Sequence, residues 1–192
     1  MKVRLLGLSL IAVAALTAAA CGGDNESASS ETVTPNGVPF DRAFIDAMVP
    51  HHEAAIAMAK AAKQAGLRQP DLLQIADDIV ITQQQEINEM RAWRQQWFGS
   101  SSIEPDGGAA LGLTEDEMGM QHVPDFSAVD DVDQAFAAMM IEHHQGAVQM
   151  ANLALERAQH PKIKKLAKAI IEAQEREVDV MEPHAGGMHH AG

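Results

Sequence analysis

Residues 47–62 read AMVPHHEAAIAMAKAA, and residues 138–154 read AMMIEHHQGAVQMANLA. Each stretch sets two adjacent histidines between methionines, with the spacing Met-x-x-His-His-x5-Met, inside an alanine-rich run that favours helix. The flanking residues repeat in the same order, so that Asp41 corresponds to Asp133, Phe44 to Phe136, Met48 to Met140, His51-His52 to His143-His144, Met58 to Met150, Pro70 to Pro161, and Gln83, Glu86 and Met90 to Gln174, Glu177 and Met181. The chain therefore contains a duplicated unit.

Each copy of this unit has the pattern of a helical hairpin, and the two copies cover residues 40–98 and 131–182. Apolar residues recur at helical spacing in both, and Gly66 and Gly99 mark predicted helix ends. One hairpin cannot cover its own apolar stripe, but two can cover each other. We therefore predict an all-α fold, a four-helix bundle over residues 38–183. A long crossover, with one short helix near residues 114–121, joins the hairpins.

The paired histidines are predicted to divide between two parts of the helix surface. At about 100° per residue, His51 lies on the apolar stripe with Met48 and Met58, whereas His52 lies at its edge. The second copy has the same geometry. On the following helix of each hairpin a glutamine, a glutamate and a methionine share one face. Each hairpin can therefore bring imidazole, thioether and carboxylate groups to one neighbourhood.

This combination of groups indicates a metal site, and copper in particular. Thioether and imidazole ligands together suit copper, above all Cu(I), because sulfur is soft and polarisable, and silver should compete at the same site. Calcium and magnesium would need oxygen ligands, which are sparse here. The predicted metal ligands are Met48, His51, His52, Met58, Met140, His143, His144 and Met150.

Other residues are candidates for orienting or supplementing these ligands. Buried imidazoles need partners, and Glu86 and Glu177 can either orient the histidines or bind metal themselves. Met90 and Met181 are further candidate ligands or core filler. Segments with no core to fill could catch copper and pass it on. Their residues are Met118, Met120 and His122 in the crossover, and His184, Met188, His189 and His190 in a predicted flexible tail, residues 184–192.

Residues 1–21 have the layout of an export signal, in which Lys2 and Arg4 precede an apolar stretch and small residues lead to Cys21. A cysteine directly after three alanines is typical of a bacterial lipobox. This predicts a lipoprotein whose lipidated Cys21 holds it at the outer side of the cell membrane. The alternative is an ordinary secretory signal and a secreted or periplasmic protein. Residues 22–37 are small, polar and acidic, and predict a disordered tether.

Cysteine content and charge exclude several classes of site and partner. Cys21 is the only cysteine among 192 residues, so the exported domain has neither an internal disulfide nor a thiolate ligand. The net charge of −13 argues against nucleic acid as a partner, because phosphate binding needs the opposite sign. The sequence leaves open whether the chain forms a homo-oligomer or meets a copper-handling partner protein.

Two other functions stay open at this point. In a scaffold or partner-binding lipoprotein, the histidines would serve only as hydrogen-bond partners of Glu86 and Glu177. A ferritin-type redox enzyme is the third alternative, but di-iron bundles place glutamate three residues before histidine, where this chain has Met48 and Met140. The sequence contains no nucleophile–base pattern, phosphate loop or zinc-type cysteine set, so we predict no catalytic residues.

The stretches FDRAFIDAMVPHHEAAIAMA and DQAFAAMMIEHHQGAVQMA, with the later QQQEINEM and EAQEREVDVM, resemble the signature of the domain-of-unknown-function 305 family. The resemblance covers residues 38–183 and implies an exported bacterial protein with a ferritin-like four-helix bundle. Some members are associated with periplasmic copper binding and copper resistance. This implies the eight methionines and histidines of the two motifs as ligands here. The crossover carries fewer methionines than in some relatives.

Overall fold

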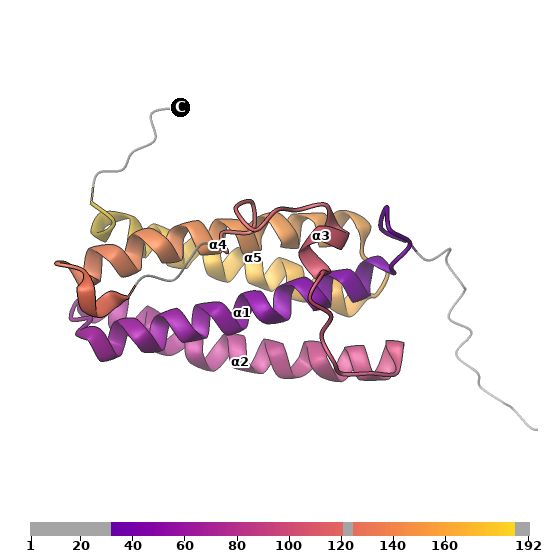
Figure 1. The fold of residues 1–192 in the computed structure, drawn as a ribbon, viewed down its shortest axis with the longest axis horizontal. Coiled ribbons are helices and arrows are strands. Elements are labelled where there is room, and N and C mark those ends of the chain that lie inside the picture. The colour runs from indigo at the N-terminus through magenta and orange to yellow at the C-terminus, as the bar shows by residue number, and fades with distance from the viewer. Residues whose placement is uncertain (1–31, 121–124, 187–192) are drawn as a thin grey trace, which may run out of the picture.

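The computed structural model describes residues 32–120 and 125–186, and its four long helices form two antiparallel hairpins packed side by side (Figure 1). The first hairpin consists of α1 (Phe40–Ala65) and α2 (Pro70–Phe98), and the second of α4 (Val132–Arg157) and α5 (Pro161–Met181). Three short helices are α3 (Gly107–Leu111), η1 (Phe126–Ala128) and η2 (Glu182–His184). The predicted all-α, ferritin-like four-helix bundle is confirmed.

The ends of the long helices follow from local backbone chemistry. Pro70 and Pro161 occupy the first positions of α2 and α5, where a helix does not use the missing N–H. Helix α1 ends at Gly66, whose φ of 106° permits the left-handed turn that bonds back to the carbonyls of Ala62 and Lys63. The prolines that begin α2 and α5 therefore occur at matching places in the repeat, whereas α4 is followed by Ala158, in extended conformation, where α1 has Gly66.

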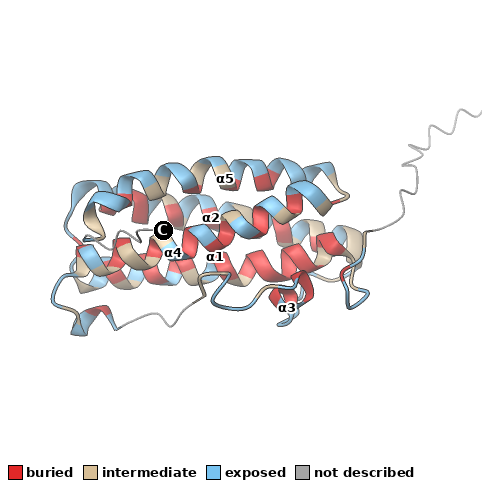
Figure 2. Ribbon diagram, turned by 90° about the horizontal axis from the view of Figure 1, so that it is seen from above, coloured by how far each residue is buried: buried red, intermediate tan, exposed pale blue. Residues whose placement is uncertain are grey.

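The core lies along the inward stripe of each long helix, whereas the outward faces are exposed (Figure 2). Phe44 and Phe136, which correspond in the repeat, are both completely buried. Equivalent side chains from the two copies therefore build the two halves of one core, as the amphipathic pattern predicts. None of the helices in the described part of the chain is long and apolar enough to cross a membrane.

Each hairpin has one buried aspartate that binds the turn of the other hairpin. Asp41, in the first turn of α1, accepts hydrogen bonds from the backbone N–H groups of Gln159–His160 at 3.0 and 2.8 Å. Its repeat partner Asp133, in the first turn of α4, accepts from those of Arg68–Gln69 at 2.7 and 3.1 Å. Each carboxylate satisfies donors that the start of the next helix leaves free. The start of α1 is thereby held at the end of α4, and the two helices run antiparallel.

The crossover between the hairpins differs from the prediction. Its short helix is α3, and residues 114–120 form turns instead of the predicted helix. Thr114 and Glu117 cap each other across one turn, and Gly119, with a φ of 64°, ends it. Helix α3 packs across α1 just before Pro50, which has no N–H to offer the carbonyl of Asp46.

Both ends of the described chain are more ordered than predicted. Residues 32–37, the last part of the predicted tether, form a turn in which Thr34 is buried and Val33 pairs with Pro39. Residue His184, predicted in a flexible tail, closes η2 and its Nε2 lies 2.7 Å from Oδ2 of Asp71. The remaining tail and lipidation candidates, together with one crossover candidate, lie outside the described residues: Cys21, His122, Met188, His189 and His190.

Candidate metal centre

The two histidine pairs meet at the middle of the bundle. Helices α1 and α4 each contain 26 residues, and His51 and His143 are each the twelfth, so antiparallel packing places them opposite one another. Their ring centroids lie 3.7 Å apart, with the ring planes tilted by 38°. The rings of His52 and His144 lie 6.3 and 6.5 Å from those of their sequence neighbours. The structure thus brings imidazoles from both hairpins together.

A glutamate bonds the second histidine of each pair. Nε2 of His52 lies 2.8 Å from Oε2 of Glu86 on α2, and Nε2 of His144 lies 2.6 Å from Oε2 of Glu177 on α5. Both imidazoles are completely buried, whereas the glutamate side chains are 22% and 19% exposed. The polar contacts therefore run from α2 through α1 and α4 to α5, with the same arrangement on both sides.

The hydrogen-bond partners decide which ring nitrogen carries the proton. Carboxylate and carbonyl oxygens accept, so Nε2 of His52 and of His144 donates to its glutamate. Nε2 of His51 donates to the backbone carbonyl of Met118, at 2.8 Å. In a neutral imidazole the other nitrogen then keeps its lone pair. In that neutral form, three of the four histidines present an unprotonated Nδ1 inside the bundle.

These nitrogens have no hydrogen-bond partner within residues 32–120 and 125–186. Nδ1 of all four histidines is buried and unpaired, and so is Nε2 of His143. Leaving one buried polar atom unpaired costs about 1–3 kcal/mol, and native cores rarely keep several together. A metal ion that accepts their lone pairs would remove this cost.

Burial keeps the central pair of rings neutral. Burial lowers the pKa of His51 from 6.5 to about 3, and repulsion from His52 is the next largest cause, while the hydrogen bond to Met118 acts in the opposite direction. Burial also lowers the pKa of His143 well below its ordinary value, and repulsion from His51 adds to this. At neutral pH both rings are therefore uncharged, which is the form that binds metal.

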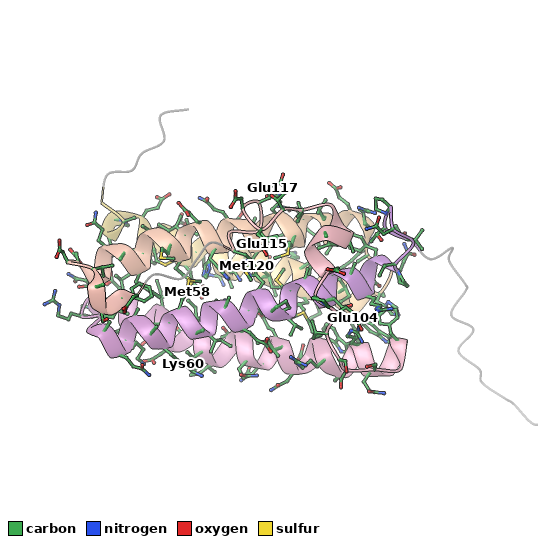
Figure 3. The ribbon with its side chains drawn as sticks, in the orientation of Figure 1. Met58, Lys60, Glu104, Glu115, Glu117 and Met120 are labelled. Carbon is green, nitrogen blue, oxygen red and sulfur yellow. The ribbon has the colours of Figure 1, made fainter. Side chains whose placement is uncertain are left out.

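All predicted methionine ligands are buried. Met48, Met140 and Met150 are completely buried and Met58 is 3% exposed, and the candidates Met90 and Met181 are also completely buried. Figure 3 shows Met58 on α1 and Met120 on the crossover. Burial alone suits core filling as well as metal binding. In the described part of the chain, no three His, Cys, Asp or Glu side chains form a group that could hold a metal ion.

The crossover covers the histidines from one side, which the sequence did not indicate. Its main chain at Met118 lies so close to α4 that a Cβ atom on Gly146 would be 2.0 Å from the Met118 carbonyl oxygen. The first repeat has Ala54 at the equivalent position. An isolated glycine in a helical pattern was the available signal, because it often marks a close backbone approach.

Two buried glutamines are further polar groups to which sequence reasoning gave no role. Gln83 and Gln174 are each 3% exposed, and the Oε1 atom of each is unpaired among the described residues. Gln83 lies about one helical turn before Glu86 on α2, and Gln174 lies about one turn before Glu177 on α5. Each glutamine is therefore on the same face of its helix as the glutamate that bonds a histidine. By contrast, the predicted tail ligand His184 lies beyond α5 and bonds to Asp71 at the start of α2.

Comparison with known proteins identifies relatives for the whole bundle. The model of the family described as a domain of unknown function, DUF305, matches residues 19–94 and 41–185. The Cu(I)-bound structure of CopM is 33% identical, covers 74% of this chain and 93% of CopM, and has a TM-score of 0.60. CopM has also been solved with Cu(II) and with silver.

Two further relatives extend the range of organisms. A DUF305 protein from Streptomyces coelicolor is 25% identical, covers 74% of this chain and 89% of its own, and has a TM-score of 0.66. The uncharacterized protein L153 of Acanthamoeba polyphaga mimivirus is 42% identical over 52 residues, which are 27% of this chain and only 34% of that protein. On the family match and the fold together, this chain belongs to the DUF305 family.

Proposed function

We propose that this protein binds copper ions outside the cytoplasm, most strongly as Cu(I), and serves in copper buffering, relay or resistance. The observation that carries the proposal is the set of unpaired, buried imidazole nitrogens at the centre of the bundle. A neutral imidazole is a good copper ligand, and the adjoining methionines offer the soft sulfur that Cu(I) prefers. The metal-bound forms of CopM support the choice of copper.

Each group of the centre has a place in this proposal. Nδ1 of the histidines is the binding atom where Nε2 is held by Glu86, Glu177 or Met118. The carboxylates then orient the rings and increase their basicity. Met48, Met58, Met140 and Met150 supply thioether ligands. Copper is the cargo of this site, and we assign it no catalytic step.

A scaffold function is the second candidate, and one observation favours it. The His52–Glu86 and His144–Glu177 hydrogen bonds join the two helices of each hairpin. In a scaffold, forming these hydrogen bonds would be the only role of His52 and His144. They leave the unpaired nitrogens of His51 and His143 unexplained, which is why copper binding is the preferred proposal.

Anaerobic titration with Cu(I) against a competing chelator tests the proposal. The four-histidine variant carries His51→Ala, His52→Ala, His143→Ala and His144→Ala. We expect its Cu(I) affinity to fall by at least about a hundredfold. Removing a group that only orients a metal ligand typically lowers the metal affinity by about 10- to 100-fold, and removing a direct ligand should lower it further. Circular dichroism must show that this variant remains helical.

A matched control changes two histidines outside the centre, His160→Ala and His184→Ala, and should keep the affinity of the unaltered protein. Equal affinity in the four-histidine variant would mean that copper binds elsewhere. No Cu(I) binding by the unaltered protein would favour the scaffold function.

We also propose that the protein is exported and held at the cell membrane by a lipid on Cys21. The signal-like residues 1–21 and the cysteine after three alanines support this. Replacement Cys21→Ala should move the protein from the membrane fraction to the soluble exported fraction. An unchanged distribution would contradict lipid anchoring.

A further inference from the structure

Positive charge in this acidic chain is concentrated at the start of α5. Four of its 14 lysines and arginines, Lys162, Lys164, Lys165 and Lys168, lie within seven residues. All four are exposed. The charged residues in the second half of the same helix are mainly acidic instead. In a chain with a net charge of −13, the start of α5 therefore presents a strongly basic surface, which we name the lysine patch after these four residues.

Little in the fold neutralises this patch. Lys168 pairs with Glu172 at 3.7 Å, a contact between exposed side chains and therefore weak. Within residues 32–120 and 125–186, no carboxylate lies within 4.0 Å of the amino groups of Lys162, Lys164 or Lys165. Three ammonium groups are thus available to a partner.

Partly buried aromatic residues at the end of α2 lie next to the lysine patch. The amino group of Lys162 lies 6.0 Å from the ring centre of Trp93. Trp93 stacks on Trp97 at 5.6 Å, and Trp97 stacks on His160, just before α5, at 3.8 Å. Tryptophan beside lysine is the composition found where proteins meet the headgroup region of a bilayer.

The described chain begins at this same end of the bundle. The side chains of Gln159 and Thr32 bond to each other, and Arg157 lies near the carbonyl of Val33 at 3.5 Å. The ten residues 22–31 separate Thr32 from Cys21. At about 3.5 Å per residue they can span at most about 40 Å. An anchor on Cys21 would therefore attach this end of the bundle to a membrane, at a distance of at most about 40 Å.

We propose that the lysine patch docks the bundle on the surface of an anionic phospholipid bilayer. Each basic residue near such a surface contributes about 1 kcal/mol, which is about fivefold in partitioning. The remaining acidic surface is repelled, so docking also fixes the orientation of the bundle. An acidic protein has matching charge, but the nearby chain start favours the membrane. The choice of a membrane rests on the lipid anchor proposed at Cys21, whereas copper binding plays no part in it.

Binding to vesicles tests this surface directly. The protein is the exported form beginning at residue 21 with Cys21→Ser, so that no lipid contributes; the core between Val38 and Ala185 is intact in it. Vesicles of phosphatidylglycerol mixed with phosphatidylcholine are compared with pure phosphatidylcholine at about 0.15 M salt. We expect binding to the anionic vesicles alone, reduced at least about tenfold by Lys162→Gln, Lys164→Gln, Lys165→Gln and Lys168→Gln together.

The control variant removes the same charge elsewhere, through Lys60→Gln, Lys63→Gln, Arg68→Gln and Arg176→Gln, and should bind the vesicles within about twofold of the parent. An equal loss in both variants would show an effect of net charge and overturn the patch. If the partner were an acidic protein, the parent would not bind anionic vesicles. That result would overturn the proposal that the lysine patch docks on a lipid surface. Both variants should keep the parent Cu(I) affinity, which separates this result from the proposed function.

Discussion

His51 and His143 combine two properties at the scale of single residues. Both rings are buried and neutral, and both keep ring nitrogens without a hydrogen-bond partner among the described residues. A proton and a metal ion compete for the same lone pair. Because the pKa of His51 is about 3, protons compete weakly at this ring even in mildly acidic medium. The core therefore favours a metal ion where an exposed histidine would be charged.

The lowered pKa values predict how the metal-free protein responds to pH. An unfolded histidine has a pKa near 6.5, so below that value the unfolded chain binds protons that folded His51 and His143 do not. Their contribution to stability is complete above pH 6.5 and is lost as the pH falls toward 3. From pH 7 to pH 5, we expect His51 to reduce the free energy of unfolding by about 2 kcal/mol, and His143 to act in the same direction. Urea unfolding at both pH values, with a chelator present, measures this loss.

The double variant His51→Leu and His143→Leu provides the comparison for this pH effect. It should lose markedly less stability between pH 7 and pH 5 than the parent, whatever its stability at pH 7. The same dependence on pH in both proteins would show that other groups cause it and that these two rings accept protons in the fold.

A buried ion pair gives a second prediction at this scale. Asp46 and Arg94 are 3% and 2% exposed, and Arg94 also donates to the carbonyl of Ser100 at 2.8 Å. Asp46→Asn leaves the guanidinium with only the exposed Glu104, at 3.9 Å, as a countercharge and should cost about 3–5 kcal/mol. The exposed pair Glu53–Arg91 is the control, and Glu53→Gln should cost less than about 1 kcal/mol. Chemical unfolding compares the two variants, and equal losses would contradict this view of the buried pair.

At the scale of elements, the contact between the crossover and α4 depends on Gly146, which has a hydrogen atom where alanine has a methyl group. Glycine to alanine inside a helix ordinarily stabilises it by about 1 kcal/mol. At Gly146 the added Cβ would meet the Met118 carbonyl oxygen at 2.0 Å, a backbone group that must move. We therefore expect Gly146→Ala to destabilise the protein by about 1–3 kcal/mol, measured by thermal or urea unfolding.

The neighbouring exposed residue supplies the control for this substitution. Gln145→Ala should change stability by no more than about 0.5 kcal/mol. A stabilised Gly146→Ala protein would show that the crossover moves away from α4 at no cost. Since His51 donates to the same carbonyl, the variant should also alter the histidine ring signals in NMR spectra.

The long helices could be predicted from sequence because their signals are local. Apolar spacing, Pro70 and Pro161 at helix starts and Gly66 at a helix end operate within a few residues. The crossover could not, since its course depends on contacts with distant segments. Helix α3 lies where Pro50 frees a carbonyl of α1, and Gly119 limits the predicted helix to one turn.

For the whole molecule, duplication explains why one centre forms. Two antiparallel helices of 26 residues each bring their central residues together, so His51 meets His143. The second histidine of each pair, His52 or His144, contacts a glutamate of the other helix in its hairpin. The sequence predicted that His51 and His143 face inward, but it placed His52 and His144 at the edge of the apolar stripe, whereas both are completely buried. It could not show that the two halves join, or that the imidazole nitrogens stay unpaired, because both depend on the register between hairpins, which Asp41 and Asp133 hold.

Because the centre draws residues from both hairpins, copper binding should stabilise the whole fold. A ligand that binds only the folded state adds about 2.7 kcal/mol at a free concentration one hundred times its Kd. We expect Cu(I) at that excess to raise the urea midpoint of the parent and of the His160→Ala, His184→Ala control. It should leave the four-histidine variant unchanged, because in that variant no imidazole of α1 or α4 remains to bind copper. If Cu(I) bound chiefly to chain segments outside the bundle, the midpoint of the parent would not rise with copper. If it bound the unfolded chain, the midpoint would fall, and in either case the copper site would not be the junction of the two hairpins.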